Sequence, residues 1–421
     1  MERVRVFPRL LRIHRRLSER AWLYGLTALS GFLGLLAIWP ITYGRTIGGD
    51  AAKFHYGGVL LARGYAPYLH FWDIKPPMIY YVTAALAWLA PNDPWTQFYL
   101  GSFLTMAASV ATIVLAALLV DRRTRGQLGA VATGLTVLSY STFLFVPTRG
   151  IMPKFYAFAF GLAGVYCVLD RRRYLLGAAL ATASAGFWQF GAVFVGIALG
   201  EVLRRREYDR VAKMVGVCGG VTLLVVAPIV LRGGGVAMLN QVVFTPIQGD
   251  EGVALAERLH KLYEYTLRLW PLYGLGVVGS LAAAYRDRRN WWVAAGVGWT
   301  LLQLLRLDFD TQPDVMLFVV FAAMGVGLLV GRLRKRDRLV VSVLVVLMAA
   351  NGLVPAHEDF TGRHWPEQAT RTVDRHFIDQ RVPPESCMVS MAGYDTWSAG
   401  KARLPRTCGD ERLGRPSIHG D

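Results

Sequence analysis

The chain has few charged residues. Only 18% of its 421 residues are Asp, Glu, Lys or Arg, whereas a soluble domain carries about 25%. Hydrophobic residues make up 54%, and apolar runs of 15 to 25 residues recur along most of the sequence. This combination excludes a soluble enzyme, a disordered chain and a coiled coil. It indicates a protein that crosses a membrane several times.

Cysteines and nucleotide-binding motifs are also scarce. The four cysteines have unrelated spacings, which excludes a zinc ribbon or a small disulfide framework. Cys167 and Cys218 lie in apolar runs and are expected to pack there. Cys387 and Cys408 lie in a polar tail, where they could pair or remain free thiols. The sequence contains no Asn-x-Ser/Thr sequon, no glycine-rich phosphate loop and no recognisable nucleotide-sugar site.

Many of the apolar runs are long enough to cross a bilayer, because about 20 helical residues span its hydrocarbon core. Residues 174–203 lie between two arginine triplets, and we expect a hairpin of two short helices broken near Gly186. Residues 78–90 are too short to cross and are bracketed by prolines, so we expect them at the outer interface. The other expected spans are residues 22–42, 95–120, 127–146, 155–169, 211–231, 266–285, 291–307, 315–331 and 338–355.

The net charge of +17 is concentrated between the apolar runs. Short cytoplasmic loops are enriched in Lys and Arg, and every basic cluster fits on one side if 11 helices cross. The sequence therefore predicts an all-α polytopic membrane protein with about 11 transmembrane helices. This topology accounts for the charge without a nucleic-acid partner. The clusters lie in the N-terminal tail and at residues 122–125, 171–173, 204–206, 286–289 and 332–338.

Three regions follow from this topology. Residues 1–21 form a cytoplasmic basic tail, residues 22–355 a multi-span membrane domain, and residues 356–421 an exported tail. The arginine-rich start precedes a full-length span without a small-residue cleavage site, which predicts a retained helix rather than a signal peptide. We expect a multi-pass plasma-membrane protein with its N-terminus inside and its C-terminus outside.

The outer loop over residues 43–94 contains the densest group of polar and aromatic residues. Taken singly, each has an ordinary explanation. Asp50 could cap a short helix that ends at Gly64, Trp72 could belong to an interfacial aromatic belt, and Lys75 could extend toward lipid headgroups. Capping and catalysis are compatible, because a capped carboxylate has a fixed orientation. The loop contains Gly48-Gly49-Asp50, Gly64-Tyr65-Ala66-Pro67-Tyr68 and Trp72-Asp73-Ile74-Lys75-Pro76-Pro77.

This combination resembles the first outer loop of the GT-C superfamily of polyprenyl-phosphate-sugar-dependent glycosyltransferases. That group includes protein O-mannosyltransferases and the aminoarabinose transferases of lipid A. Among its members, the chain looks most like archaeal dolichyl-phosphate-mannose mannosyltransferases. The resemblance implies GT-C-like interfacial helices in the loop, catalysis by Asp50, and contact of Lys75 with the lipid phosphate. Where aminoarabinose enzymes have a glutamate before this lysine, the chain has Ile74, and Asp73 lies one residue earlier.

These residue types suit transfer from a phosphate-linked sugar. The leaving group is already an anion, so one carboxylate suffices where a glycoside hydrolase uses two. Asp50 would accept the proton of the acceptor hydroxyl, and Lys75 would stabilise the developing phosphate charge. Direct displacement would invert the anomeric centre. Arg149 and Lys154 are further candidates for the donor phosphate. Candidate substrate contacts are Tyr56, Tyr68, Trp72, Asp73, Arg306 and Asp310.

A required metal ion is not expected, because the first loop lacks an acidic cluster like that of the oligosaccharyltransferase branch. Asp308 and Asp310, near Asp314 and beside Arg306, could bind sugar hydroxyls or a weak divalent cation, or could simply belong to a solvated turn. Two residues that interrupt the apolar hairpin, Trp188 and Gln189, could line a lipid groove or pack in the core.

We therefore predict an inverting glycosyltransferase that moves a sugar to a glycan or protein acceptor on the outer face. The resemblance implies mannose as the sugar and a polyprenyl (dolichyl) phosphate as its carrier. The alternative is a transporter or flippase of a lipid-linked sugar. Such proteins place ionisable residues near the middle of the bilayer, whereas the spans here are nearly free of charge. A non-enzymatic scaffold would leave the loop motif unexplained.

Overall fold

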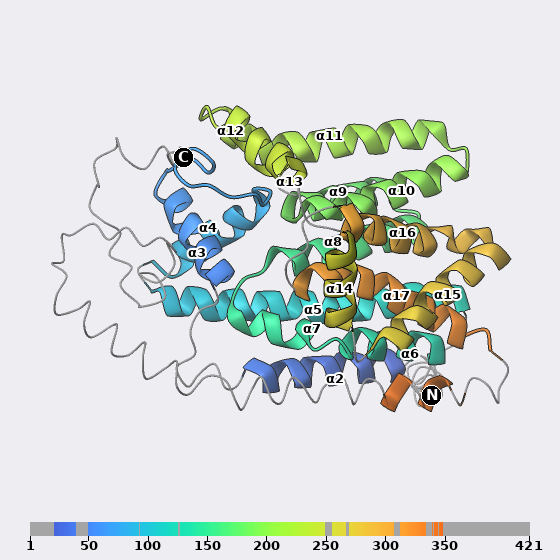
Figure 1. Ribbon diagram of the computed structural model, residues 1–421. Coiled ribbons are helices and arrows are strands. Elements are labelled where there is room, and N and C mark those ends of the chain that lie inside the picture. Colours follow the sequence, from blue (N-terminus) through green and yellow to red (C-terminus); the bar gives the residue numbers. More distant parts are fainter. Residues whose placement is uncertain are drawn as a thin grey trace, which may run out of the picture.

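The computed structural model describes residues 21–38, 49–91, 93–124, 127–248, 255–266, 269–306 and 312–333, with short pieces between 339 and 347. Every regular element in these ranges is helical. The longer helices run side by side along the long dimension of the molecule (Figure 1). The short helices α3 (Gly49–Ala62) and α4 (Met78–Leu89) form a separate group at one end of this bundle (Figure 1).

Four segments are long and apolar enough to cross a membrane. They belong to α2 (Ala21–Ile38), α5 (Pro94–Thr124), α11 (Tyr208–Val230), and α17 (Met316–Val330) with the short helix η6 (Gln312–Val315) before it. Two bent helix pairs also qualify, which gives up to six candidate spans in the described ranges. The multi-span helical fold is thus confirmed, while the number 11 stays a prediction.

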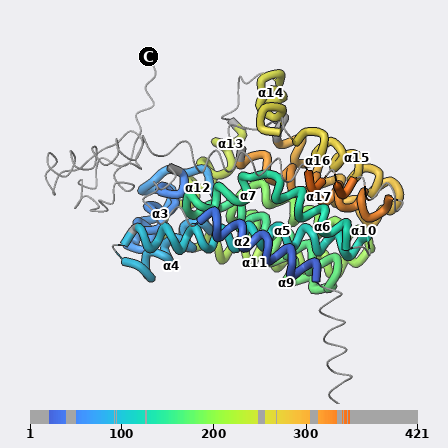
Figure 2. The backbone as a smooth tube through the Cα atoms, turned by 90° about the horizontal axis from the view of Figure 1, so that it is seen from below, coloured from blue at the N-terminus to red at the C-terminus, as the bar shows by residue number. Residues whose placement is uncertain are grey.

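Two of the six candidate spans are bent pairs of helices. The first joins α6 (Gln127–Leu138) to the segment Thr142–Arg149 at 72°, which contains α7 (Thr142–Phe145) and η2 (Val146–Arg149). The second joins α14 (Leu255–Thr266) to α15 (Trp270–Arg286) at 106°, and α14 projects from the bundle (Figure 2). Most of the expected span 338–355, and both terminal tails with Cys387 and Cys408, lie outside the described residues.

The predicted hairpin is present, but its break lies later than expected. Helix α8 (Pro153–Leu169) is followed by α9 (Tyr174–Phe187), the turn η3 (Gln189–Gly191) and α10 (Ala192–Arg204). The chain therefore turns at Trp188, and Gly186 is still helical. Gly186 serves close packing, because a Cβ there would lie 2.5 Å from the Sδ of Met78 on α4. The start of α9 and the end of α10 lie together, with 3.5 Å between Tyr174 Oη and Arg205 Nη1.

Basic clusters that are far apart in the sequence meet at one end of the bundle. Arg122, at the end of α5, lies 3.6 Å from Asp170, which follows α8. Glu201 near the end of α10 pairs with both Arg204 and Arg205 at 2.8 Å. Helices α3 and α4 lie at the opposite end (Figure 1). This arrangement agrees with the even number of crossings expected between these clusters, while the orientation in a membrane stays a prediction.

Close helix contacts hold α3 in place. A Cβ on Gly58 would lie 2.5 Å from the backbone carbonyl carbon of Thr83, so α3 rests directly on α4. Small residues permit such close backbone approach, which is a common way of packing helices in membranes. The phenol ring of Tyr80 on α4 packs edge-on against Phe71 at a centroid distance of 4.9 Å. Together α3, α4 and the connecting loop form one support for the residues of the outer-loop motif.

Candidate active site

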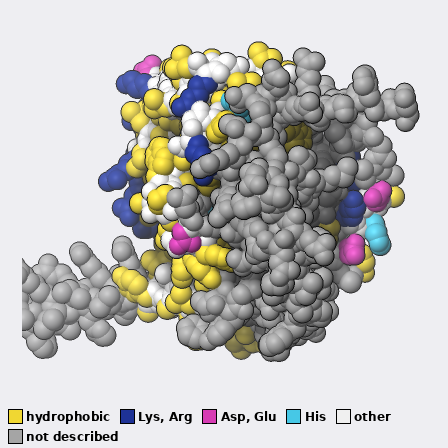
Figure 3. Space-filling model, turned by 90° about the vertical axis from the view of Figure 1, so that its left-hand side faces the viewer, with side chains coloured by type: hydrophobic (Ala, Val, Ile, Leu, Met, Phe, Trp, Pro, Cys, Tyr) yellow, Lys and Arg dark blue, Asp and Glu magenta, His cyan; other side chains and the backbone are white. Residues whose placement is uncertain are grey.

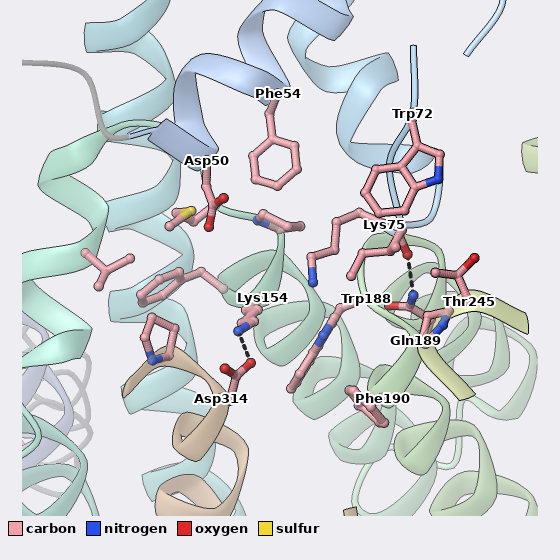
Figure 4. A pocket seen from close by; sticks show the side chains of 17 residues that line it. Asp50, Phe54, Trp72, Lys75, Lys154, Trp188, Gln189, Phe190, Thr245 and Asp314 are labelled. Carbon is pink, nitrogen blue, oxygen red and sulfur yellow. Dashed lines mark hydrogen bonds and ion pairs between the residues drawn. The ribbon is translucent and has the colours of Figure 1, made fainter. Parts of the chain in front are cut away.

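A cavity of about 290 Å³ lies at the end of the bundle next to α3 (Figure 4). Side chains from six parts of the chain meet there, and several of them are charged or aromatic. Figure 3 shows this end of the molecule, where hydrophobic side chains and Lys and Arg side chains are interspersed on the described surface. The principal lining residues are Asp50, Phe54, Trp72, Ile74, Lys75, Met152, Lys154, Phe155, Trp188, Gln189, Phe190, Thr245 and Asp314.

Asp50 lies in the first turn of α3 and points into the cavity (Figure 4). Its side chain is exposed. The free N–H groups and the dipole at a helix start favour a carboxylate there. The neighbouring Ala51 is buried against Gly150, where a Cβ would come within 2.5 Å of the Ala51 Cβ. Two features therefore hold the start of α3 in place. One is the helix itself, and the other is the contact of Ala51 with Gly150, which directly follows η2.

Lys75 is partly buried, and its ammonium group extends toward the same space as Asp50 (Figure 4). The Tyr68 hydroxyl donates a 2.7 Å hydrogen bond to the Lys75 carbonyl, and the Lys75 N–H donates to Asp73 at 3.3 Å. Burial and the nearby Lys154 ammonium lower the Lys75 pKa to about 8, against the opposing effect of Asp314, Asp73 and Asp50. The site thus holds a cation that is poorly hydrated and suited to pairing with an anion.

Lys154 provides a second ammonium group in the cavity. Lys154 lies in the first turn of α8, and its ammonium group lies 2.5 Å from a carboxylate oxygen of Asp314, which is in η6. It also lies 5.3 Å from the centre of the Trp188 ring, within range of a cation–π contact. The cavity therefore combines two carboxylates with two lysines, and one lysine already has a close partner.

The comparisons with known proteins agree on one class of enzyme. A family model described as DolP-mannose mannosyltransferase matches residues 64–229. A dolichol phosphate-mannose mannosyltransferase of Haloferax volcanii is 29% identical over 316 residues, which cover 74% of this chain and 68% of that protein. The chain is a glycosyltransferase.

Two solved structures with a similar fold are forms of one protein, ArnT. ArnT from Cupriavidus metallidurans bound to undecaprenyl phosphate aligns with a TM-score of 0.55 and 15% sequence identity. The apo form of ArnT gives a TM-score of 0.54 and 16% identity. Each alignment covers 91% of this chain and 76% of ArnT. The helical arrangement of the described residues is therefore similar to that of ArnT.

Asp73, predicted to contact substrate, does not line the cavity of the enzyme. Its side chain is fully buried, and one carboxylate oxygen lies 2.7 Å from Lys53 Nζ. The other oxygen accepts a short hydrogen bond from the Tyr80 hydroxyl. Both oxygens are thus engaged by protein donors, so the structure gives Asp73 a role in holding the Lys75 loop.

The other predicted residues differ in their relation to the cavity. Trp72 lines it, and Tyr68 is buried beneath the loop, where it holds Lys75. Tyr56 packs near Phe98 in a separate apolar cluster, away from the lining. Arg149 is exposed and lies over the Phe145 ring at 4.1 Å, also outside the lining. The Arg306 side chain and Asp310 lie outside the described residues, as does Asp308.

Two glutamines of the enzyme hold the loop in ways that the sequence did not predict. The Gln189 amide group donates to the carbonyls of Ile74, at a short distance, and Val242, at 3.1 Å. Gln241 accepts from the Asp73 N–H at 3.0 Å and donates to the Tyr68 carbonyl at 2.9 Å. The position of Gln189 within an apolar run was a weak sign that this residue has a specific role. Nothing in the sequence distinguishes Gln241 in this way.

Metal ligands are not grouped in the described part of the enzyme. No three His, Cys, Asp or Glu side chains within those ranges are placed to hold one metal ion. The charged groups of the cavity are instead two carboxylates and two ammonium groups.

Proposed function

We propose that the enzyme transfers mannose from a dolichyl or other polyprenyl phosphate to a glycan or protein acceptor. The main support is that Asp50 and Lys75 line one cavity. The matching family model and the Haloferax relative both carry the description of a dolichol-phosphate-mannose mannosyltransferase. The related ArnT structure contains undecaprenyl phosphate, a lipid phosphate of the same chemical class.

The charges of the cavity suggest how the donor would bind. We assign the donor phosphate to the side of Lys75 and Lys154, and the sugar to the space between them and Asp50. Small-molecule cavities usually have volumes of about 300–1,000 Å³, so one of about 290 Å³ suits the sugar phosphate and not the long lipid tail. The exposed Trp72 at the rim offers an aromatic face to the sugar ring.

Bond formation would then need one base and one cation. The acceptor oxygen attacks the anomeric carbon, its proton passes to Asp50, and the glycosyl–phosphate bond breaks with inversion. The bonding electrons remain on the phosphate, whose charge Lys75 stabilises. A required metal ion is not part of this proposal, because the lysines supply the positive charge. A chelator should therefore leave turnover unchanged.

We place the reaction at the outer face of the plasma membrane. The support is that the described arginine clusters at residues 122–124, 171–173 and 204–206 gather at the end opposite α3 (Figure 1). Cytoplasmic loops are the usual location of such clusters. With that end inside, the cavity faces outward, where a lipid-linked donor is needed because nucleotide sugars are cytoplasmic.

The test uses full-length enzyme in lipid, radiolabelled dolichyl-phosphate mannose and a lipid-linked glycan acceptor. Wild type should transfer mannose, and Asp50→Asn should lose at least about 100-fold in turnover while binding the donor normally. Asp209→Asn, which changes an exposed carboxylate at the start of α11, is the control and should keep full activity. Normal turnover by Asp50→Asn would reject the base role. Donor movement across vesicles without any sugar transfer would instead favour the flippase.

A further inference from the structure

A second cavity lies at the end of the bundle opposite the candidate active site. It is a groove of about 410 Å³ between the start of α9 and the start of α11. Four basic side chains line it, together with two leucines and Tyr174. The residues used below are Arg172, Arg173, Leu175, Leu176, Arg210 and Lys213.

The positive charge of this groove is only partly balanced by neighbouring carboxylates. Arg210 pairs with Glu207 at 2.7 Å, and its guanidinium lies 4.6 Å from the centre of the Tyr174 ring. No carboxylate among the described residues forms an ion pair with Arg172, Arg173 or Lys213. Three cations thus face one concave surface without a fixed partner, which favours an anionic ligand.

Apolar side chains continue directly from these cations. Leu175 and Leu176, in the first turn of α9, are 49% and 45% exposed. Along α11, Leu223 and Leu224 are also exposed, at 67% and 76%. The groove therefore lies where apolar helices begin, at the depth at which lipid headgroups meet hydrocarbon. A free phosphate ion would contact only the basic side chains, whereas a lipid would contact both the basic side chains and the exposed leucines.

We propose that this groove binds the phosphate group of an anionic membrane lipid, with the lipid chains against Leu175 and the apolar face of α11. Basic pockets beside membrane helices are suited to such headgroups, because Lys and Arg near the surface attract anionic lipids. The site is separate from the Asp50 cavity, because α9 places about 20 Å between its two ends. It takes part in no step of sugar transfer.

The test titrates full-length enzyme in neutral detergent with short-chain phosphatidylglycerol, and follows binding by the rise in unfolding temperature. Phosphatidylcholine serves as the lipid without net charge, and inorganic phosphate as the anion without a lipid chain. The groove variant is Arg172→Gln/Lys213→Gln. The matched control is Arg286→Gln/Arg288→Gln, which removes two exposed charges elsewhere on the chain.

The groove variant should weaken phosphatidylglycerol binding roughly tenfold or more, and the control less than about twofold. Arg172→Lys/Lys213→Arg should retain most of the affinity, because it keeps both charges. Unchanged unfolding temperatures without lipid would show that the variants are folded. Equal losses in groove and control variants would overturn the proposal in favour of diffuse attraction. Equal stabilisation by inorganic phosphate or by phosphatidylcholine would overturn the assignment to an anionic lipid.

Discussion

The ammonium group of Lys53 lies 2.7 Å from a carboxylate oxygen of Asp73. This ion pair joins α3, which begins with Asp50, to the loop that contains Lys75. The Asp73 side chain is fully buried, and that of Lys53 is 19% exposed. The pair therefore connects the proposed base to the proposed phosphate cation through a contact that is shielded from water.

Breaking this pair from either side should destabilise the enzyme and slow transfer. Lys53→Met leaves a buried carboxylate without its cation, at a cost of about 3 kcal/mol. Asp73→Asn should have a smaller effect, because an amide can still accept the Tyr80 hydrogen bond. In a double-mutant cycle on unfolding free energy, the effects of Lys53→Met and Asp73→Asn should not add. Strict additivity would contradict a direct interaction between the two side chains.

The pH dependence of transfer should reflect Lys75. Burial and the Lys154 ammonium lower its pKa to about 8 from an ordinary 10.5, so the free enzyme loses this proton as pH rises through about 8. Since only the charged form stabilises the phosphate, kcat/KM should fall above that pH. A bound donor phosphate favours the ammonium form, so the same fall in kcat should occur at higher pH.

The unfolding free energy of the enzyme should rise over the pH range in which kcat/KM falls. Between about pH 8 and 10.5, an unfolded chain still binds the Lys75 proton and the folded enzyme does not, so unfolding free energy rises with pH from this group. In Lys75→Arg the side chain stays charged, and the fall in kcat/KM near pH 8 should disappear from whatever activity remains. A wild-type profile that is flat up to pH 10 would contradict the assignment of Lys75.

The pair of Lys154 and Asp314 should respond unequally to substitution. If Lys154 contacts the donor phosphate, Lys154→Ala should lower kcat/KM for the donor about 10- to 100-fold. Asp314→Asn removes a negative charge near that phosphate, so it should leave donor binding unchanged or tighter. Donor titrations of both variants measure the difference. Equal losses of kcat/KM in Lys154→Ala and Asp314→Asn would indicate that the ion pair only holds α8 against η6.

Parts of the fold could be predicted because they depend on local sequence. Proline and run length predict α4 as a separate short helix, and Asp50 after two glycines predicts the start of α3. The hairpin followed from the arginine triplets at each end. Its break was expected near Gly186 and lies at Trp188, just after the end of α9. The number of spans also depends on bends such as the 106° between α14 and α15.

The candidate site was predictable chiefly where a short motif contains its residues, although Lys154, outside that motif, was also a candidate and lines the cavity. Asp50 and Lys75 lie in the same loop, and the structure brings them to one cavity. The ion pair of Asp73 was not predictable, because its partner Lys53 lies on a different element, 20 residues earlier. Gln241 is 168 residues from Asp73, in a segment without a clear period. Contacts of this kind arise from tertiary packing and leave no pattern in the sequence.

Gly150 offers a further test of how closely the start of α3 must be positioned. Its φ is +115°, and a Cβ would lie 2.5 Å from the Ala51 Cβ and 3.2 Å from the Phe98 ring. Gly150→Ala should therefore push the first turn of α3, and with it Asp50, away from Lys75. Displacements of about 1 Å can reduce turnover about 100-fold, so we expect a loss of at least about 10-fold in kcat.

Gly64→Ala is the matched control for this substitution. Gly64 has a similarly positive φ of +94°, but a Cβ there would meet no atom within 4 Å. Both substitutions carry the backbone strain of a left-handed residue, about 1 kcal/mol or more, and both should lower the unfolding temperature. Only Gly150→Ala should also lower kcat, because Gly150 contacts the first turn of α3, which contains Asp50, whereas Gly64 lies after the other end of that helix. Equal kcat values for the two variants would show that turnover does not depend on the contact between η2 and α3.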